Sequence, residues 1–276
     1  MIKLDVLIET LKLLWRETIM VDLHSHIIWD IDDGSKSREM TLSMLKTAEA
    51  NGTRKIVATP HFYRGVWEVP FNEVKKRIED VKSLAKENNI GIEIYSGQEV
   101  YYSENILEYY NEGFISTINN SRYMLIELPI KEFNIWEVLD NIYELQLEGI
   151  VPVLAHPERY MPFIKNPILI NKFIKEGFLF QLNAGSMVGS FGKSVKKTAE
   201  IFLKNKIYSF IGSDAHRDEK RNANLTDGIN IIKSFNSDYI DIFKENGEGA
   251  IENREIIFRG NEIKEKKRRL LEKIFG

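Results

Sequence analysis

The chain has 276 residues, a net charge of −3, 43% hydrophobic residues and no cysteine. Its length fits one large domain or an α/β barrel, and its hydrophobic content is sufficient for a buried core. The absence of cysteine excludes disulfides, thiolate metal sites and every phosphatase that attacks phosphorus with a thiolate. The slight negative charge provides no general attraction to nucleic acid.

The sequence carries no signal for a membrane or for secretion. It contains no run of 18 apolar residues, so we predict no membrane span. The N-terminus lacks the basic stretch, the apolar core and the small-residue cleavage site of a signal peptide. We therefore expect a cytoplasmic protein.

Seven short apolar runs alternate with amphipathic stretches along the chain. The runs, which we predict as strands, are 20–27, 54–62, 92–100, 123–129, 150–158, 178–186 and 208–216. Helical patterns lie between most of them, at 37–52, 72–89, 136–149 and 194–206. Near-continuous apolar strands that alternate with helices are typical of a parallel sheet covered by helices. Seven such units predict a closed or nearly closed barrel, with a doubly wound open sheet as the alternative.

The two ends of the chain differ from this pattern. Residues 1–19 carry an apolar helical stripe, which predicts an N-terminal helical extension. The final stretch, 261–276, reads "NEIKEKKRRLLEKIFG" and predicts a basic amphipathic helix. We expect both to be terminal helices docked on the body, with a membrane or partner contact as the alternative. Residues 20–276 would then form a single barrel domain.

All five histidines lie at or just past the C-terminal ends of predicted strands. His24 and His26 are two residues apart in one strand, so their side chains project to the same side. His61, His156 and His216 end the segments "VATPH", "PVLAH" and "GSDAH". Barrel enzymes build their active sites at this rim. A single histidine on an apolar strand is usually a core residue, but five at one rim indicate metal ligation.

Carboxylates occur at equivalent places in the predicted strands. Asp33 belongs to "DDG", Glu99 follows the third strand, Glu127 lies in the fourth, and Asp214 precedes the last histidine by two residues. An acid inside an apolar strand is costly unless it is paired or metal-bound, and for Glu127 alone a buried salt bridge is an equal alternative. Mixed imidazole and carboxylate donors suit manganese, iron or zinc. The nine predicted ligands are His24, His26, Asp33, His61, Glu99, Glu127, His156, Asp214 and His216.

Two arginines follow the last of these motifs. Arg159 belongs to "AHPER", and Arg221 lies five residues after "GSDAH". Metal cations would repel guanidinium groups unless an anion lay between them, and arginine binds phosphate oxygens in a bidentate fork. We therefore predict that both arginines bind a phosphate. The alternative for each is a surface ion pair with a nearby acid such as Glu158 or Asp218.

Aromatic residues cluster beside the predicted ligands. The segment "HFYRGVWEVP" begins at His61, and Tyr101 and Tyr102 follow Glu99. These side chains would either grip a phenyl ring and a peptide or close the barrel mouth by packing.

Taken together, these motifs resemble the PHP (polymerase and histidinol phosphatase) superfamily. The H-x-H, D-D-G, T-P-H, G-x-E, A-H-P-E-R and S-D-x-H blocks occur in the order of that superfamily over residues 22–216. Within it, "DIDDGSKSREM", "SRYMLIELP" and "AHPERY" resemble the bacterial metal-dependent protein tyrosine phosphatases of capsule and exopolysaccharide loci. Such proteins usually begin near the equivalent of Met20, so the first 19 residues depart from the pattern.

The resemblance implies a distorted seven-stranded, TIM-like (β/α) barrel with three divalent metal ions. Manganese is the first choice, and iron and zinc are the alternatives. It implies a first metal on His24, His26, Glu99 and Asp214, a second on Glu99 as a bridge with Glu127 and His156, and a third on Asp33, His61 and His216. Arg159 and Arg221 would hold the phosphate.

The implied reaction is hydrolysis of a phosphate monoester by hydroxide formed on the metals, without a covalent enzyme intermediate. His216 and Asp214 are the candidates for protonating the leaving oxygen. The implied partner is the phosphorylated tail of a bacterial tyrosine kinase that controls polysaccharide export, and the oligomeric state stays open.

Three other functions compete with this one. They are a small-molecule phosphatase acting on a substrate such as histidinol phosphate, a PHP-type nuclease, and a non-catalytic metal-bound regulator of the kinase. The slight negative charge counts against a nuclease, which would need a basic groove. The presence of all nine ligand positions favours catalysis over a purely regulatory role.

Overall fold

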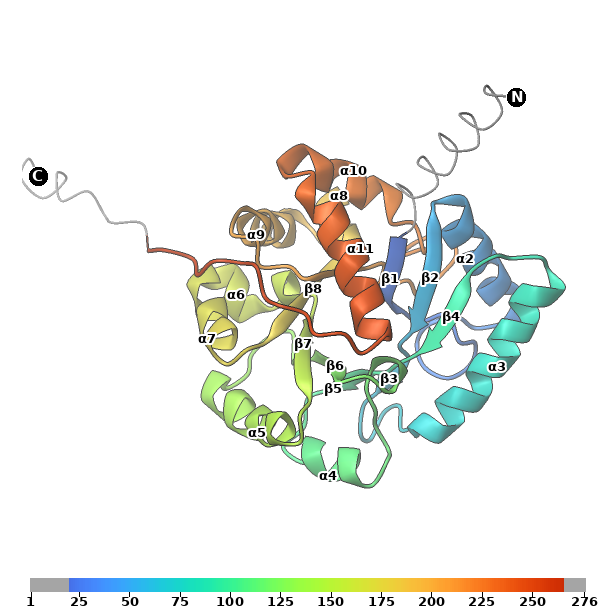
Figure 1. Ribbon diagram of the computed structural model, residues 1–276, viewed down its shortest axis with the longest axis horizontal. Coiled ribbons are helices and arrows are strands. Elements are labelled where there is room, and N and C mark those ends of the chain that lie inside the picture. Colours follow the sequence, from blue (N-terminus) through green and yellow to red (C-terminus); the bar gives the residue numbers. More distant parts are fainter. Residues whose placement is uncertain (1–19, 266–276) are drawn as a thin grey trace, which may run out of the picture.

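The computed structural model describes residues 20–265, in which parallel strands form a ring surrounded by helices (Figure 1). One sheet has the order β1 (Met20–Ser25), β2 (Thr53–Ala58) and β4 (Glu93–Ser96). The other has the order β3 (His61–Phe62), β5 (Glu99–Tyr101), β6 (Tyr123–Glu127), β7 (Val151–Ala155), β8 (Leu179–Asn183) and β9 (Phe210–Gly212). Every pair of neighbouring strands in these two sheets is parallel.

Two of the seven predicted strands are each divided into two segments. Residues 59–60 separate β2 from β3, and residues 97–98 separate β4 from β5. Pro60 has no N–H to donate, so the ladder is interrupted there. The Gly97 N–H donates to the Ala58 carbonyl at 2.9 Å, and the Glu99 N–H donates to the Pro60 carbonyl at 3.0 Å. These bonds carry the same two chain segments from one sheet into the other, so both sheets belong to one ring.

The ring closes where β9 meets β1. Ser25 and Ala215 form a parallel bridge. On either side of it, the Asp214 N–H donates to the His24 carbonyl at 2.8 Å, and the His26 N–H donates to the Ala215 carbonyl at 2.9 Å. The predicted barrel is therefore confirmed, and the open doubly wound sheet is wrong. The closing contact lies among the predicted metal ligands.

Ten helices surround the ring in the described part of the chain (Figure 1). They are α2 (Arg38–Ala50), α3 (Phe71–Glu87), α4 (Ile106–Asn111), α5 (Ile135–Leu147), α6 (Met161–Lys165), α7 (Ile170–Lys175), α8 (Ala184–Val188), α9 (Lys193–Lys204), α10 (Thr226–Phe235) and α11 (Asp238–Ile251). The four predicted helical patterns correspond to α2, α3, α5 and α9, with every boundary within two residues. Ser37 caps α2 by accepting a hydrogen bond from the Met40 N–H at 3.2 Å.

The inside of the ring is filled from its strands and closed at one end by α11. A single apolar cluster contains side chains from β1, β2, β6, β7, β8 and β9, together with Ala250 and Ile251 of α11. At Gly247 a Cβ would lie 2.7 Å from the Val21 Cβ, so α11 lies directly against the start of β1. The opposite, C-terminal ends of the strands remain as the mouth of the barrel.

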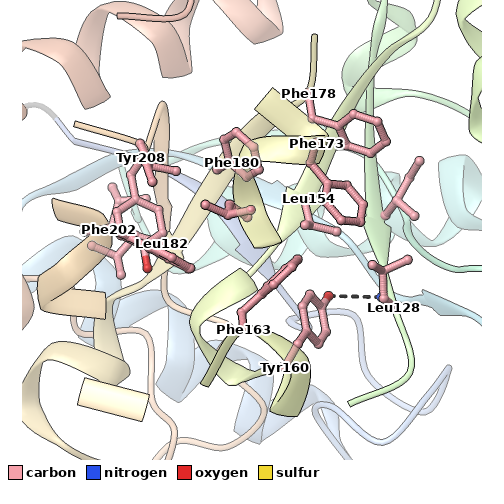
Figure 2. Close-up of a cluster of buried hydrophobic side chains, with 14 of the residues drawn as sticks. Leu128, Leu154, Tyr160, Phe163, Phe173, Phe178, Phe180, Leu182, Phe202 and Tyr208 are labelled. Atoms are coloured by element: carbon pink, nitrogen blue, oxygen red, sulfur yellow. Dashed lines mark hydrogen bonds between the residues drawn. The ribbon is translucent and has the colours of Figure 1, made fainter. Parts of the chain in front are cut away.

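An aromatic cluster packs outside β7 and β8, under α6, α7 and α9 (Figure 2). It comprises Tyr160, Phe163, Phe173, Phe178, Phe180, Phe202 and Tyr208. The rings of Phe163 and Phe173 meet edge to face, with centroids 5.5 Å apart. The Tyr160 hydroxyl accepts from the Leu128 N–H at 3.0 Å and donates to the Ala155 carbonyl at 2.8 Å. This hydroxyl therefore fixes the turn after β7 to the ends of two strands.

The predictions for the chain ends fall largely outside this structure. The predicted N-terminal helix, residues 1–19, and residues 266–276 of the predicted C-terminal helix lie outside the described residues. Residues 261–265 are described and are not helical. There the Ile263 N–H donates to Asn171 Oδ1 at 2.9 Å. Between residues 20 and 265, no helix combines the length and the apolar character that crossing a membrane requires.

Candidate metal centre

The structure brings all nine predicted ligands to the C-terminal mouth of the barrel. Seven of them line a pocket of about 180 Å³ together with both predicted arginines. The other two, His24 and His26, are completely buried beneath it. Parallel strands end on the same side of a sheet, which is why residues up to 192 positions apart in the sequence meet here.

His24, His26, Glu99 and Asp214 form the deepest group. The Nε2 atoms of the two histidines are 3.1 Å apart, and each lies 3.2 Å from Glu99 Oε2. Asp214 Oδ1 lies 3.7 and 3.6 Å from the same two nitrogens. Donors bound about 2.1 Å from one metal ion stand about 3.0 to 3.4 Å apart, so His24, His26 and Glu99 are spaced for a shared cation, and Asp214 lies slightly farther from the two histidines.

A second group surrounds Asp33 at the outer edge of the pocket. Asp33 Oδ1 lies 3.2 Å from His216 Nε2 and 3.5 Å from His61 Nε2. His26 also belongs to this group, because its ligand atom lies within 4.8 Å of the other three. The resemblance assigned His26 to the first metal alone, whereas the geometry places it between both groups.

Glu99 is the central carboxylate of the site. Besides His24 and His26, it contacts His156 through Oε1 at 3.0 Å and His61 through Oε2 at 3.1 Å. Glu127 lies beyond it, with Oε1 3.6 Å from His156 Nε2 and Oε2 3.8 Å from His61 Nδ1. Within residues 20–265, these two imidazoles are the ion-pair partners of Glu127, so its geometry differs from a salt bridge to lysine or arginine.

The two neighbouring glutamates of the centre differ in their electrostatics. Burial and the neighbouring charge of Glu99 raise the pKa of Glu127 well above its usual range. Burial also opposes ionisation of Glu99, but the charges of His24 and His61 hold its pKa well below the usual range. Two neighbouring carboxylates repel each other when both are ionised, and a cation between them would stabilise the ionised form of both.

Three of the predicted ligands have buried polar atoms without a hydrogen-bond partner, and this shows whether the residues suit metal ions. Asp33 Oδ1, His61 Nδ1 and His156 Nδ1 are buried and have no hydrogen-bond partner of acceptable geometry among the described residues. Buried polar atoms are nearly always satisfied, and the exceptions require an explanation. Asp33 Oδ1 and His61 Nδ1 face other predicted ligands, and carboxylate oxygens and imidazole nitrogens are donors that manganese, iron and zinc prefer. The residues present therefore fit divalent cations.

Three side chains that the sequence analysis did not assign orient the predicted ligands. Asp32 Oδ2 accepts from His26 Nδ1 at 2.7 Å and from the His61 N–H at 2.9 Å. Gln181 Oε1 accepts from His24 Nδ1 at 3.0 Å, and Asn183 Nδ2 donates to Asp214 Oδ2 at 2.7 Å. Such partners fix the tautomer and the direction of a metal-binding imidazole. In the sequence, Asp32 is the first aspartate of "DDG", and Gln181 and Asn183 are two amides, two residues apart, in the apolar run 178–186.

Both arginines bind the same carboxylate. Arg159 Nη1 donates to Asp214 Oδ2 at 2.8 Å, and Arg221 Nη2 donates to Asp214 Oδ1 at 2.7 Å. The alternative pairing of Arg159 with Glu158 is wrong, because Glu158 is buried elsewhere and accepts from Ser186 Oγ at 2.7 Å. Burial opposes ionisation of Asp214, yet its histidine and arginine neighbours hold its pKa well below the usual range.

The backbone is strained at three positions of the site. His156, Asp214 and Arg221 have φ values of 30°, 51° and 52°, in the left-handed region that side chains disfavour. His156 directly precedes the 3₁₀ turn Pro157–Arg159, which Tyr160 anchors to the strands. Strained residues persist where the surrounding structure over-determines them, and they concentrate at functional sites.

Aromatic side chains form one wall of the pocket. Tyr63 and Tyr101 stack with centroids 4.0 Å apart, and Trp67 stacks on His61 at 5.0 Å. All three aromatic residues line the pocket opened by the predicted ligands. Burial and the neighbouring Tyr63 raise the pKa of Tyr101 to about 12, so its phenol is neutral at physiological pH. The packing alternative is confirmed for these residues, and contact with a phenyl ring or a peptide stays a prediction.

The fold and the site together define a PHP-type α/β barrel with a cluster of imidazole and carboxylate groups at its mouth. The chain belongs to the CpsB/CapC family of capsular polysaccharide synthesis, whose family model matches residues 20–252.

Named relatives and one solved structure agree with this family. The chain is 33% identical to the tyrosine-protein phosphatase CpsB of Streptococcus pneumoniae, over 77% of this chain and 89% of the relative. It is 30% identical to the tyrosine-protein phosphatase YwqE of Bacillus subtilis, over 91% of this chain and 98% of the relative. A solved structure from crystallographic work on YwqE of Bacillus subtilis and CpsB of Streptococcus pneumoniae, described there as metal-dependent tyrosine phosphatases, superposes on this chain with a TM-score of 0.84. The two chains are 28% identical, and the match covers 89% of this chain and all of the other.

Proposed function

We propose that this protein is a metal-dependent protein-tyrosine phosphatase. The observation that carries the proposal is the convergence of nine imidazole and carboxylate groups at one barrel mouth. Seven of them line a pocket with two arginines and an aromatic wall, and the other two are buried beneath it. The relatives at about 30% identity, named as tyrosine-protein phosphatases, support the same activity.

The proposed cofactor is a set of three divalent cations, with manganese as the first choice. His24, His26, Glu99 and Asp214 would hold one, Glu99, Glu127 and His156 a second, and Asp33, His61 and His216 the third. When bound, such ions polarise a phosphoryl group and lower the pKa of water. The position of His26 between two groups suggests that it also borders the third ion.

The two arginines have a proposed role toward the substrate. Arg159 and Arg221 bind the nonbridging phosphoryl oxygens, because each guanidinium offers several N–H donors in a fixed fork. Neither His216 nor Asp214 suits protonation of the leaving oxygen. The cationic neighbours of Asp214 hold its pKa well below the usual range, and burial lowers the pKa of His216, whose Nε2 faces Asp33 as a proposed ligand and whose Nδ1 contacts the Asp214 carbonyl. A phenol has a pKa near 10, so its departure needs little help from an acid.

The aromatic wall supports an aryl substrate. Tyr63, Trp67 and Tyr101 offer ring faces within the same pocket as the arginines. A phosphotyrosine ring can stack on such a surface, whereas an alkyl phosphate gains less from it. We propose as partner the phosphorylated tyrosine tail of a bacterial kinase that regulates capsular polysaccharide synthesis, with the cytoplasm as its location. The family to which the chain belongs supports this choice.

A comparison of two substrates tests the proposal. The protein is treated with a chelator, restored with manganese, and assayed on a phosphotyrosyl peptide and on histidinol phosphate. We expect hydrolysis of the peptide only after restoration and a clearly higher kcat/KM on the peptide. Equal or higher efficiency on histidinol phosphate would favour a small-molecule phosphatase. Hydrolysis by the chelated protein would rule out the metal-dependent mechanism.

A further inference from the structure

Both pocket arginines pack on the ring of Phe191, a residue that neither the motifs nor the proposed mechanism uses. The guanidinium carbon of Arg159 lies 4.5 Å from the ring centroid, and that of Arg221 lies 5.7 Å from it. Both distances fall within the range of a favourable cation–π contact. Each guanidinium is therefore held by the carboxylate of Asp214 and by the face of one shared aromatic ring.

The local backbone brings this ring to its position. Phe191 lies in the loop between α8 and α9, flanked by Gly189 with φ of 88° and Gly192 with φ of 94°. Glycine adopts these conformations without the steric penalty that a side chain would bring. A Cβ at Gly185 would lie 3.2 Å from Phe191 Cε2, so the ring packs closely over the start of α8.

The contact addresses an electrostatic problem of the site. Two guanidinium groups that share one carboxylate repel each other, and the negative face of an aromatic ring offsets part of that repulsion. The ring accepts no conventional hydrogen bond, so it leaves the N–H donors of both arginines available for phosphoryl oxygens. A polar side chain at the same place would compete for those donors.

A second cavity next to the pocket offers space into which the Arg221 side chain could turn. Phe191 and Arg221 both line this cavity of about 560 Å³, and Arg221 also lines the catalytic pocket. The cavity contains the side chains of Glu219 and Asp227, which are possible acceptors for a guanidinium. Phe191 is the one aromatic side chain among the described residues that line this cavity, so its loss would enlarge the space around Arg221 and these acids.

We propose that Phe191 is a positioning residue that holds Arg159 and Arg221 in place for binding the phosphoryl group. This inference rests on the proposed function, which assigns the two arginines to phosphate. It predicts that the aromatic face, rather than apolar volume alone, matters at position 191.

The test compares Phe191→Leu and Phe191→Ala with Phe191→Tyr in the manganese-loaded full chain. The measurements are kcat and KM on a phosphotyrosyl peptide, and the Kd of inorganic phosphate by calorimetry. We expect the Leu and Ala variants to raise KM and the phosphate Kd by about tenfold, with kcat within about threefold. The Tyr variant, which keeps the ring face, should stay within about twofold of the parent for both quantities.

A matched control is Phe235→Leu. Phe235 also lies under a cation, with Lys204 Nζ 5.8 Å from its centroid, but it is at the end of α10, outside both cavities. This variant should leave KM and the phosphate Kd unchanged.

Two outcomes would overturn the role of Phe191. They are a Leu variant that behaves like the parent, or a Tyr variant as weak as the Leu variant. If the Ala variant does not fold, the Leu and Tyr variants decide the question. If the parent protein does not hydrolyse the peptide, the proposed function fails, and the phosphate Kd still reports on Phe191 independently.

Discussion

The mouth of the barrel and the aromatic cluster are both buried, and both are built on β7 and β8, yet their chemistry is opposite. On β8, Phe180 and Leu182 point into the aromatic cluster (Figure 2). The alternate residues Gln181 and Asn183 hydrogen-bond to predicted metal ligands. Successive side chains of a strand point to opposite faces. One strand can therefore stabilise the fold with one face and orient reactive groups with the other.

The two regions also differ in how well their polar groups are satisfied. In the aromatic cluster, the Tyr160 hydroxyl both accepts and donates a hydrogen bond. At the mouth, buried atoms of Asp33, His61 and His156 lack partners, and left-handed backbone occurs at three positions. The comparison teaches that the cluster supplies stability, whereas the mouth is arranged for ligands and gains little stability from its own contacts.

Glu99→Gln should abolish most of the activity of the barrel mouth and leave the aromatic cluster folded. The change removes the carboxylate that contacts four imidazoles, so we expect kcat/KM to fall by about 10⁴-fold, as for loss of metal catalysis. Circular dichroism should be unchanged. Glu93→Gln, at the exposed start of β4 and on the same predicted strand, is the control and should remain active. Wild-type rates in manganese-loaded Glu99→Gln would contradict the assignment.

Phe173→Ala should have the reverse effect. Phe173 is fully buried and its ring meets those of Phe163 and Phe178, so the truncation should cost about 3 to 5 kcal/mol of unfolding free energy in a urea titration. Phe173→Leu keeps most of the volume and should lose less than about 1.5 kcal/mol. At a temperature where both variants are folded, kcat/KM should match the parent. A large loss of activity without a loss of stability would show that the two regions are not separable.

Asp32→Asn should lower the metal affinity of the barrel mouth without removing a proposed ligand. The change removes the charge that orients the His26 imidazole, so metal affinity should fall by about 10- to 100-fold in a competition with a chelator. Asp30→Asn is the matched control, because Asp30 is exposed in the same loop and its φ of 55° suits asparagine. Equal metal affinity in both variants would exclude an orienting role for Asp32.

Tyr160→Phe should have the smallest effect, at the border between the two regions. The ring stays in the aromatic cluster, but the Leu128 N–H and the Ala155 carbonyl lose the hydroxyl that joins them. We expect a loss of about 1 to 2 kcal/mol of unfolding free energy, because a buried donor is left unsatisfied. Urea unfolding measures this loss, and a variant as stable as the parent would show that the hydroxyl is not needed.

Much of the fold followed from local patterns. The apolar runs and four amphipathic stretches predicted the strands and helices α2, α3, α5 and α9. Six helices of the described chain were not predicted. Helices α4, α6, α7 and α8 have only five or six residues and depend on packing against the ring, and α8 begins inside the predicted strand 178–186. Helices α10 and α11, with 10 and 14 residues, were missed despite their amphipathic faces. The breaks at Pro60 and Gly97 were also missed, although the proline was visible in the sequence.

The sequence by itself determined that histidines and carboxylates would meet, because residues at the C-terminal ends of parallel strands share one rim whatever their separation along the chain. Only the tertiary structure decided which groups touch. The shared use of His26, the pairing of both arginines with Asp214, and the place of Phe191 depend on strand register and on loop conformations with positive φ. Such features arise from packing between distant segments, which local side-chain patterns do not encode.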